Sequence, residues 1–216
     1  AAQAAGIPEV WVAAGTYTAV SNPIMTMKSN VQVYGGFAGT ETSRSQRDWT
    51  INVTIIDGQN IRRCVIGANN ATLDGFTLTH GWASDGGGMY NAGTSPTVTN
   101  CIFSNNSATN NAGGGGGIAN YSGSVPILTN CTFSGNSATY GGGGVGNVSS
   151  SPTIVDCTFT GNMAYYGGGM ASIMSSSPTI INCTFTGNSA TWSGGGMLNY
   201  ISSAPAVRAC KFCGNT

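Results

Sequence analysis

The chain has few charged residues and a single histidine, and these shortages exclude several functions. Of its 216 residues, 7 are Lys or Arg, 7 are Asp or Glu and one is His80, so the formal net charge is zero. Charged residues make up 6% of the chain, against about a quarter in an ordinary globular domain. Proteins that bind nucleic acid carry a basic patch, and so few cations cannot form one. We therefore expect no nucleic-acid partner.

Long apolar runs are also missing. No apolar run in the sequence approaches the roughly 18 residues that cross a bilayer as a helix, so we expect no membrane insertion by this chain. The first residue is Ala1 with no signal-peptide pattern after it, so we expect any export signal to have been removed or never included. Glycine is abundant, at 34 residues, which alone would be compatible with disorder. The 40% of apolar residues recur at fixed positions, however, which favours a folded chain.

What the sequence does have is a repeat. Proline recurs at spacings of 30, 26, 26 and 27 residues, followed after five residues by cysteine, after two more by phenylalanine and after three more by asparagine. Repeats of about 20 to 50 residues are typical of solenoids. The members are Pro96, Pro126, Pro152, Pro178 and Pro205; Cys101, Cys131, Cys157, Cys183 and Cys210; Phe103, Phe133, Phe159, Phe185 and Phe212; and Asn106, Asn136, Asn162, Asn188 and Asn215.

The content of one unit indicates which solenoid it is. Short β-branched stretches are broken by Gly, Ser and Pro, and the long 3.6-residue periodicity of helical repeats is missing. We expect Ile180, Cys183 and Phe185 to point inward and Thr184 outward. The sequence therefore predicts an all-β, right-handed single-stranded parallel β-helix of about seven rungs with three short strands per rung. We expect one domain over 1–216, with irregular rungs and a polar surface loop (38–49) in 1–85, and five regular rungs in 86–216.

Asparagine forms two predicted ladders. The corner before each cysteine carries an asparagine or aspartate, with Ala209 as a departure. A side-chain amide can donate to one neighbour and accept from the other, and asparagine tolerates the left-handed backbone of tight corners. We interpret both sets as structural rather than ligand-binding. The corner column consists of Asn100, Asn130, Asp156 and Asn182, and the second column runs from Asn106 to Asn215.

The repeat resembles a known group of proteins. The paired motifs Gly-Gly-(Met/Ile/Val) and Phe-x-x-Asn, and the leader segments VWVAAGTY (10–17), VQVYGGFAGTETSRSQRDW (31–49) and LDGFTLT (73–79), are similar to two sets of repeats. These are the repeats of chlamydial polymorphic outer-membrane proteins and of secreted bacterial parallel β-helix proteins in the pectate-lyase-like superfamily. The resemblance implies a β-helix fold. It also implies a secreted or surface-displayed protein with an adhesive or structural role.

That superfamily also includes polysaccharide lyases and hydrolases, so an enzyme must be considered. Glycoside hydrolysis needs two carboxylates that face one groove, and lyase chemistry needs a carboxylate or metal cluster with a base. From 86 to 207 the one charged residue is Asp156, which lies in the corner column. The leader holds the remaining candidates, Asp57, Asp74, Asp85 and His80, each at a turn. We expect no enzyme, no cofactor and no metal site, since calcium needs several carboxylate oxygens.

Two surface features are candidates for contact with partners. Thr132 and Ser134, Thr158 and Thr160, and Thr184 and Thr186 are predicted to form an outward array of the kind found in ice-binding solenoids, interrupted by Ile102 and Lys211. Threonine also simply suits an exposed strand. Tyr140, Tyr166 and Trp192, at spacings of 26, are predicted to stack as an aromatic stripe that either holds sugar rings, shields the glycine corner or contacts another molecule.

The seven cysteines are expected to be reduced. Column neighbours have parallel side-chain vectors and therefore poor disulfide geometry, so we expect them to pack as small apolar residues. Cys213 replaces an outward Ser or Thr and is predicted to be the exposed thiol. We expect end-to-end stacking of rods, in which Cys213 pairs with a neighbour's thiol, Cys64 being the other off-column candidate; a fragment of a longer surface protein is the rival explanation.

The sequence thus predicts a non-enzymatic extracellular β-solenoid with a structural or adhesive role. Its expected partners are other copies of itself, stacked end to end, or cell-surface glycans or proteins. A carbohydrate-binding or carbohydrate-cleaving protein and an ice-binding protein are the alternatives.

Overall fold

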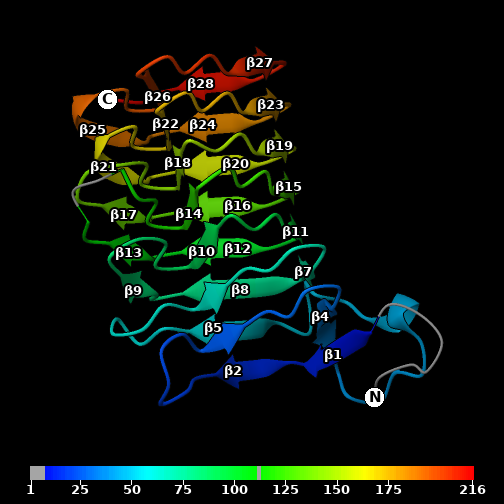
Figure 1. Ribbon diagram of the computed structural model, residues 1–216. Coiled ribbons are helices and arrows are strands. Elements are labelled where there is room, and N and C mark those ends of the chain that lie inside the picture. Colours follow the sequence, from blue (N-terminus) through cyan, green and yellow to red (C-terminus); the bar gives the residue numbers. More distant parts are fainter. Residues whose placement is uncertain (1–7, 111–112) are drawn as a thin grey trace.

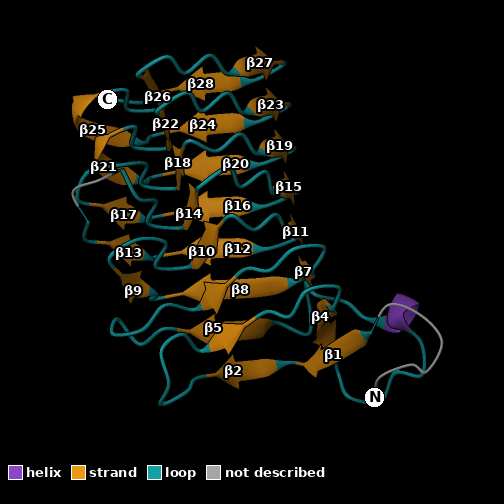
Figure 2. Ribbon diagram, viewed as in Figure 1, coloured by secondary structure: helices purple, strands orange, loops and turns teal. Residues whose placement is uncertain are grey.

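The chain winds into a straight coil of parallel strands. The structure is a computed structural model that describes residues 8–110 and 113–216. Strands occupy most of each turn, and the helix drawn in Figure 2 is the short 3-10 helix Arg44–Gln46. The strands climb in order from β1 and β2 at one end to β27 and β28 at the other (Figure 1). Like residues therefore stack on like in adjacent turns, as the repeat predicts.

Four sheets run along the coil, which we call sheets A to D. Sheet A contains β1 (Glu9–Ala13), β4 (Gln32–Phe37), β7 (Thr72–Asp74), β11 (Thr97–Thr99), β15 (Ile127–Thr129), β19 (Thr153–Val155), β23 (Thr179–Ile181) and β27 (Ala206–Arg208). Sheet B contains β2 (Gly15–Tyr17), β5 (Thr54–Asp57), β8 (Phe76–Thr79), β12 (Ile102–Ser104), β16 (Thr132–Ser134), β20 (Thr158–Thr160), β24 (Thr184–Thr186) and β28 (Lys211–Cys213). Sheet C contains β3 (Met25–Thr26), β6 (Val65–Ile66), β10 (Met89–Ala92), β14 (Ile118–Tyr121), β18 (Val145–Val148), β22 (Met170–Ile173) and β26 (Met197–Tyr200). Sheet D contains β9 (Trp82–Ala83), β13 (Ser107–Ala108), β17 (Ser137–Ala138), β21 (Met163–Tyr166) and β25 (Ser189–Ser193).

The architecture is the predicted parallel β-helix, with two differences in detail. Sheets A and B each have eight strands, so the coil has about eight turns rather than seven. The extra turn arises because β1 and β4 pair with each other as neighbours in sheet A and so belong to successive turns. Sheet D adds a fourth strand to most turns. Several of its strands are two residues long, too short for an alternating pattern to be visible in the sequence.

The interior is built from columns of identical side chains. The rings of the predicted phenylalanine column stack with centroids 4.4 to 5.0 Å apart and planes within 10° of parallel. The phenylalanines of four turns are fully buried, whereas Phe212 in the last turn is 46% exposed. Leu128, Ile154 and Ile180 of sheet A pack against the same column. Burial of these rings, together with the other apolar side chains of the core, drives folding.

The predicted cysteine column lies inside as well, and all seven cysteines are free thiols. The backbone N–H of Cys131 donates to the Sγ of Cys157 at 3.4 Å, and the same contact links each later pair of turns. Burial raises the pKa of the Cys101 thiol to about 12, so it stays protonated at neutral pH. Cys64 is completely buried. The expected pairing of Cys213 with Cys64 of another molecule is therefore wrong, since Cys64 cannot be reached without unfolding.

The second predicted asparagine column is a continuous buried ladder. The Nδ2 atom of each member donates to the Oδ1 atom of the next at 2.8 to 3.0 Å, from Asn106 to Asn215. Each Nδ2 also donates to a backbone carbonyl of the preceding turn, for example from Asn162 to Phe133 at 2.9 Å. Each Oδ1 accepts in addition a backbone N–H, as Asn162 Oδ1 does from Asn136 at 3.0 Å. The amide thereby meets its full hydrogen-bonding capacity inside an apolar core.

The corner column is also a ladder, but it is broken at Asp156. All five corner residues, Ala209 included, have the left-handed backbone expected there, with φ between 50° and 54°. Asn130 donates to Asn100 at 2.7 Å and Asn182 donates to Asp156. An ionised carboxylate has no hydrogen to give, and within the described residues no hydrogen bond joins Asp156 to Asn130. The ladder therefore consists of two separate segments.

A third ladder was not predicted. Asn91, Asn120 and Asn147 lie fully buried in sheet C, and each donates to the next at 2.9 Å. Asn147 then donates to the Oγ atom of Ser172 at 3.4 Å. The signal in the sequence was the asparagine two places after each inward Met, Ile or Val, but serine in the fourth member hid the pattern.

The polar loop packs against the strands of the irregular leader through ion pairs and cation–π contacts. The Arg47 guanidinium forms an ion pair with Asp74, with both side chains about nine-tenths buried, and lies over the rings of Tyr34 and Trp49 at 5.1 and 4.7 Å. Arg44 pairs with Glu9 on the surface. The predicted loop over 38–49 is thus held against sheet A rather than projecting from it.

Candidate functional site

Most of the candidate catalytic residues of the leader form hydrogen bonds or ion pairs with other residues of the protein. The Asp74 carboxylate accepts from Arg47 and from Asn100. The Asp85 carboxylate accepts twice from Asn110 and once, at 2.7 Å, from the hydroxyl of Tyr121. These contacts anchor a corner and a loop. Neither carboxylate is free to face a groove.

Asp57 and His80 form the one acid–base pair among the described residues. His80 Nδ1 lies 3.2 Å from Asp57 Oδ1, with side chains 44% and 26% exposed, and Asp57 also accepts from the backbone N–H of Gln59. His80 has φ 50°, the left-handed turn conformation that glycine or asparagine adopts at this place in later turns. In the described parts of the chain no three His, Cys, Asp or Glu side chains cluster as they would around a metal ion.

The predicted threonine array is present on the outer face of sheet B. Thr132, Thr158 and Thr184 are in register, as are Ser134, Thr160 and Thr186. The array is interrupted on both sides, where Ile102 pairs with Thr132 and Lys211 with Thr184. Between this face and the loop after the 3-10 helix lies a groove of about 360 Å³, which we call the threonine groove. Its described lining is Trp49, Thr50, Val53, Thr77, Asn100, Cys101, Ile102, Asn130 and Thr132.

The predicted aromatic stripe exists with one different member. Tyr140 stacks on Tyr165 with centroids 5.2 Å apart, and Tyr165 faces Trp192 at 6.0 Å. Tyr166 instead meets Tyr140 edge-on at 5.2 Å. An irregularity in the pairing of β21 with β25 after Ala164 causes this exchange of places, and no periodicity in the sequence marks it. Each of these rings thus has part of one face covered by its neighbour, although Trp192 at the end of the stack stays 68% exposed.

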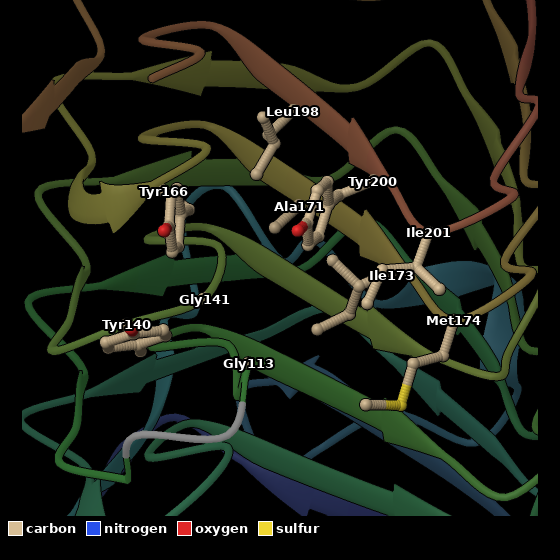
Figure 3. A pocket seen from close by; sticks show the side chains of 10 residues that line it. All are labelled: Gly113, Tyr140, Gly141, Tyr166, Ala171, Ile173, Met174, Leu198, Tyr200 and Ile201. Carbon is tan, nitrogen blue, oxygen red and sulfur yellow. The ribbon is translucent and has the colours of Figure 1, made fainter. Parts of the chain in front are cut away.

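Tyr166 lines a second groove, on the outer face of sheet C, which we call the aromatic groove. Its volume is about 320 Å³. Figure 3 shows Tyr166 and Tyr200 on opposite sides of it, Tyr140 below Tyr166, and Ile173, Met174 and Ile201 on the far rim. Sequence reasoning found Tyr140 and Tyr166 but missed the other lining residues, because they belong to three different turns. The described lining is Gly113, Tyr140, Gly141, Tyr166, Ala171, Ile173, Met174, Leu198, Tyr200 and Ile201.

One end of this groove is formed by two backbone segments that pack closely at glycine residues. The Cβ of an alanine at 146 would lie 2.6 Å from the carbonyl oxygen of Gly113, and one at 141 would lie 2.2 Å from the same residue. Two backbones therefore touch directly where the longest repeat, of 30 residues, folds over the next turn. This contact explains glycine at these positions, and it closes the groove on the side of Gly113.

The structure does not bring all the predicted surface residues together. Trp192 stands beside the groove on Tyr165 and is 68% exposed. Cys213, also exposed, lines a hollow at the C-terminal end of the coil with Met197 and Phe212. Of the predicted surface residues, Tyr140 and Tyr166 thus line the aromatic groove together, whereas Trp192 and Cys213 each lie at a different place.

Comparison with known proteins agrees with this architecture. A family model described as a right handed beta helix region matches residues 24–214. The chain belongs to that family. No curated protein and no solved structure matches the chain. Among the described residues, no helix of this family member is long and apolar enough to cross a membrane.

Proposed function

We propose that the protein is a non-catalytic structural and adhesive β-solenoid that acts outside the cell or at a cell surface. The aromatic groove is the observation that carries this proposal. Three tyrosines and several aliphatic side chains line it, and its described lining includes no charged residue. Exposed apolar surface of this kind marks interaction sites, and the two buried asparagine ladders stabilise the rod that carries it. The resemblance to surface-displayed chlamydial and secreted bacterial repeats supports the proposed location.

The hydrogen bonds of the acidic side chains support the proposal that the protein is not an enzyme. All seven carboxylates of the chain accept hydrogen bonds from the protein itself. A general acid or nucleophile must instead face its substrate. The test is incubation with a panel of neutral and acidic polysaccharides, followed by assays for new reducing ends and unsaturated products. We expect none above background. Product that disappears in Asp57→Asn or His80→Gln would contradict the proposal.

Carbohydrate binding at the threonine groove is a second candidate function. Its lining places the Trp49 ring, which is 36% exposed, beside hydroxyl and amide groups of Thr50, Thr77 and Asn130. An aromatic face with neutral polar partners suits a neutral sugar. On a glycan array, this candidate requires that Trp49→Ala abolishes binding and that the matched Trp192→Ala does not. Equal binding by both variants would reject it.

End-to-end contact between rods is a further proposal, supported by hollows at both ends of the described coil that have apolar side chains in their lining. One is lined by Met197 and Phe212, the other by Val12, Ile24 and Met25 among others. Unpaired strand edges of this kind join to other strands, and repetition of the contact gives a filament. Electron microscopy of the native material tests it. Short separate rods, or further turns of the same chain, would contradict the filament.

Ice binding is supported only by the in-register threonines of sheet B, and Ile102 and Lys211 limit the flat array to three turns. The measurement is thermal hysteresis in dilute solution. A clear effect that Thr158→Tyr abolishes would favour this function over adhesion.

A further inference from the structure

The aromatic groove has the features of a cage for a methylated cation. Tyr166 and Tyr200 stand on opposite sides with their ring faces toward the space between them, and Tyr140 closes a third side (Figure 3). The face of an aromatic ring is the negative pole of its quadrupole and attracts cations. The described lining contains no Lys, Arg or His that would repel one.

The floor and far rim of the groove narrow the choice of ligand. The side chains of Ala171, Ile173, Leu198 and Met174 are apolar, and the side-chain polar atoms of the described lining are the tyrosine hydroxyls. A sugar there would lose water from several hydroxyl groups without enough partners, which is unfavourable. A tetra-alkylated nitrogen has no hydrogen to donate. Its methyl groups can contact the aliphatic side chains while its charge faces the rings.

Two rim residues indicate that this surface is not a by-product of the fold. The residue directly after β14 or β18 is a left-handed serine, Ser122 or Ser149, whereas the residue directly after β22 or β26 is Met174 or Ile201, with φ 56° and 52°. A β-branched residue such as isoleucine is a clear outlier in this conformation. Both side chains are nonetheless about half exposed, at 47% and 49%. Strain that brings an apolar side chain to the surface points to a function at that place.

We propose that the aromatic groove binds the quaternary ammonium group of a small choline-like molecule. This inference rests on the adhesive function proposed above and names a ligand class for the same site. The volume of about 320 Å³ lies at the small end of the range for ligand sites, which fits a trimethylammonium head better than a polymer. Choline should bind more tightly than glycine betaine, because the lining offers no cation to the betaine carboxylate.

The experiment is a titration of the whole protein, followed by the NMR signals of the Ile, Leu and Met methyl groups. Tetramethylammonium and choline are the probes, and 3,3-dimethylbutan-1-ol, which has the shape of choline without its charge, is the control ligand. We expect shifts at Ile173, Met174 and Ile201 and binding of the cations about tenfold tighter than of the neutral alcohol, since cation–π attraction is lost in the alcohol. Equal affinities would overturn the cage and leave a plain apolar site.

Variants separate the rings from the fold. Tyr200→Leu and Tyr166→Leu keep apolar volume but remove an aromatic face, so each should weaken choline binding about fivefold or more, whereas Tyr200→Phe should keep it. Trp192→Leu, an exposed aromatic outside the groove, is the matched control and should bind like the wild type. Unchanged binding in both leucine variants would contradict the proposal even if all variants fold, as circular dichroism would show.

The source of the ammonium group and the wider function are tested separately. If choline competes with phosphatidylcholine vesicles for the protein, the group is supplied by a lipid headgroup; binding of free choline without vesicle binding points to a soluble molecule. If no ammonium probe binds but the protein is still retained on cell surfaces, the proposed cage is wrong and the proposed adhesive function stands. Loss of both would remove the proposed function as well.

Discussion

Asn162 shows how much a single residue contributes to this fold. Its side chain is fully buried, and its amide takes part in bonds to the turn above and the turn below. The repeat predicted this ladder because spacing alone identified its members. The similar ladder of Asn91, Asn120 and Asn147 was missed because Ser172 interrupts that column. Chemical substitutions within a column, rather than irregular spacing, limited the prediction at this scale.

The first prediction concerns this ladder. Asn162→Ala should lower the free energy of unfolding by about 3 kcal/mol or more, because it leaves the N–H of Asn136 and the carbonyl of Phe133 buried without this partner. Urea denaturation followed by circular dichroism measures it. Asn130→Gly, in the exposed corner ladder, is the control and should cost less than about 1 kcal/mol. Similar losses in the two variants would mean that the buried ladder is not a main support.

The second prediction concerns the break in the corner ladder. Asp156→Asn supplies the missing donor toward Asn130 and keeps a residue that tolerates the left-handed backbone. We expect an increase in stability of about 0.5 kcal/mol, limited by the exposure of the corner and by weakening of the bond from Asn182. A decrease in the melting temperature would show that the carboxylate has a role that the ladder does not explain.

The third prediction concerns pH. Burial raises the pKa of the Cys64 and Cys101 thiols to about 12, from an ordinary value of 9.0. Because the unfolded thiols ionise first, the stabilisation is complete below pH 9 and is lost as the pH rises toward 12. We expect the free energy of unfolding to fall above pH 9 by about 1 kcal/mol per pH unit for each thiol. Cys101→Ala should reduce this slope; an unchanged slope would assign the loss to other groups.

At the level of strands and loops, the sequence predicted the columns of the regular turns. It did not predict the places where the chain departs from the repeat. Phe159 and its neighbours recur at fixed spacing, so their inward direction followed from the pattern. Tyr165 enters the aromatic stack through an irregular pairing, and the loop at Gly113 reaches the next turn through backbone contacts. Neither the irregular pairing nor the backbone contact produces a periodic pattern in the sequence. The aromatic groove depends on both, which is why only part of it was predicted.

The fourth prediction tests the phenylalanine column. Phe159 is enclosed between Phe133 and Phe185, with centroids 4.7 and 4.4 Å away, so the cavity in Phe159→Ala cannot collapse. We expect a loss of about 3–5 kcal/mol, against well under 1 kcal/mol for the outward Thr158→Ala. Chemical denaturation of both variants decides it. Equal effects would mean that the faces of β20 are assigned the wrong way round.

The fifth prediction tests the glycine wall of the aromatic groove. Alanine is present beside Gly146 in both adjacent turns, at Ala119 and Ala171. At 146 itself the Cβ would meet the backbone of 113–115 within 2.7 Å. Gly146→Ala should therefore lift that backbone, cost about 2 kcal/mol and speed hydrogen exchange at 113–116. Unchanged exchange there would show that the two segments do not touch.

For the whole molecule, the sequence predicted a solenoid because the five regular turns repeat the same side chains. It underestimated the number of turns because the turns of the leader do not repeat them. The strands β1 and β4, which belong to successive turns, are the clearest case: the leader lacks the Pro–Cys–Phe–Asn markers that number the later turns. The rod that results has almost no charge. Its contacts with other molecules must therefore depend on shape, apolar surface and neutral polar groups.

We propose that this rod attaches to other surfaces through its aromatic groove and performs no reaction there. The most direct measurement is retention of fluorescently labelled protein on a panel of bacterial and animal cells under flow. The wild type is compared with Tyr166→Leu/Tyr200→Leu and, as the control at the other groove, Trp49→Ala. We expect the double variant to be washed away and Trp49→Ala to be retained like the wild type. Retention of the double variant, with loss of Trp49→Ala, would contradict it.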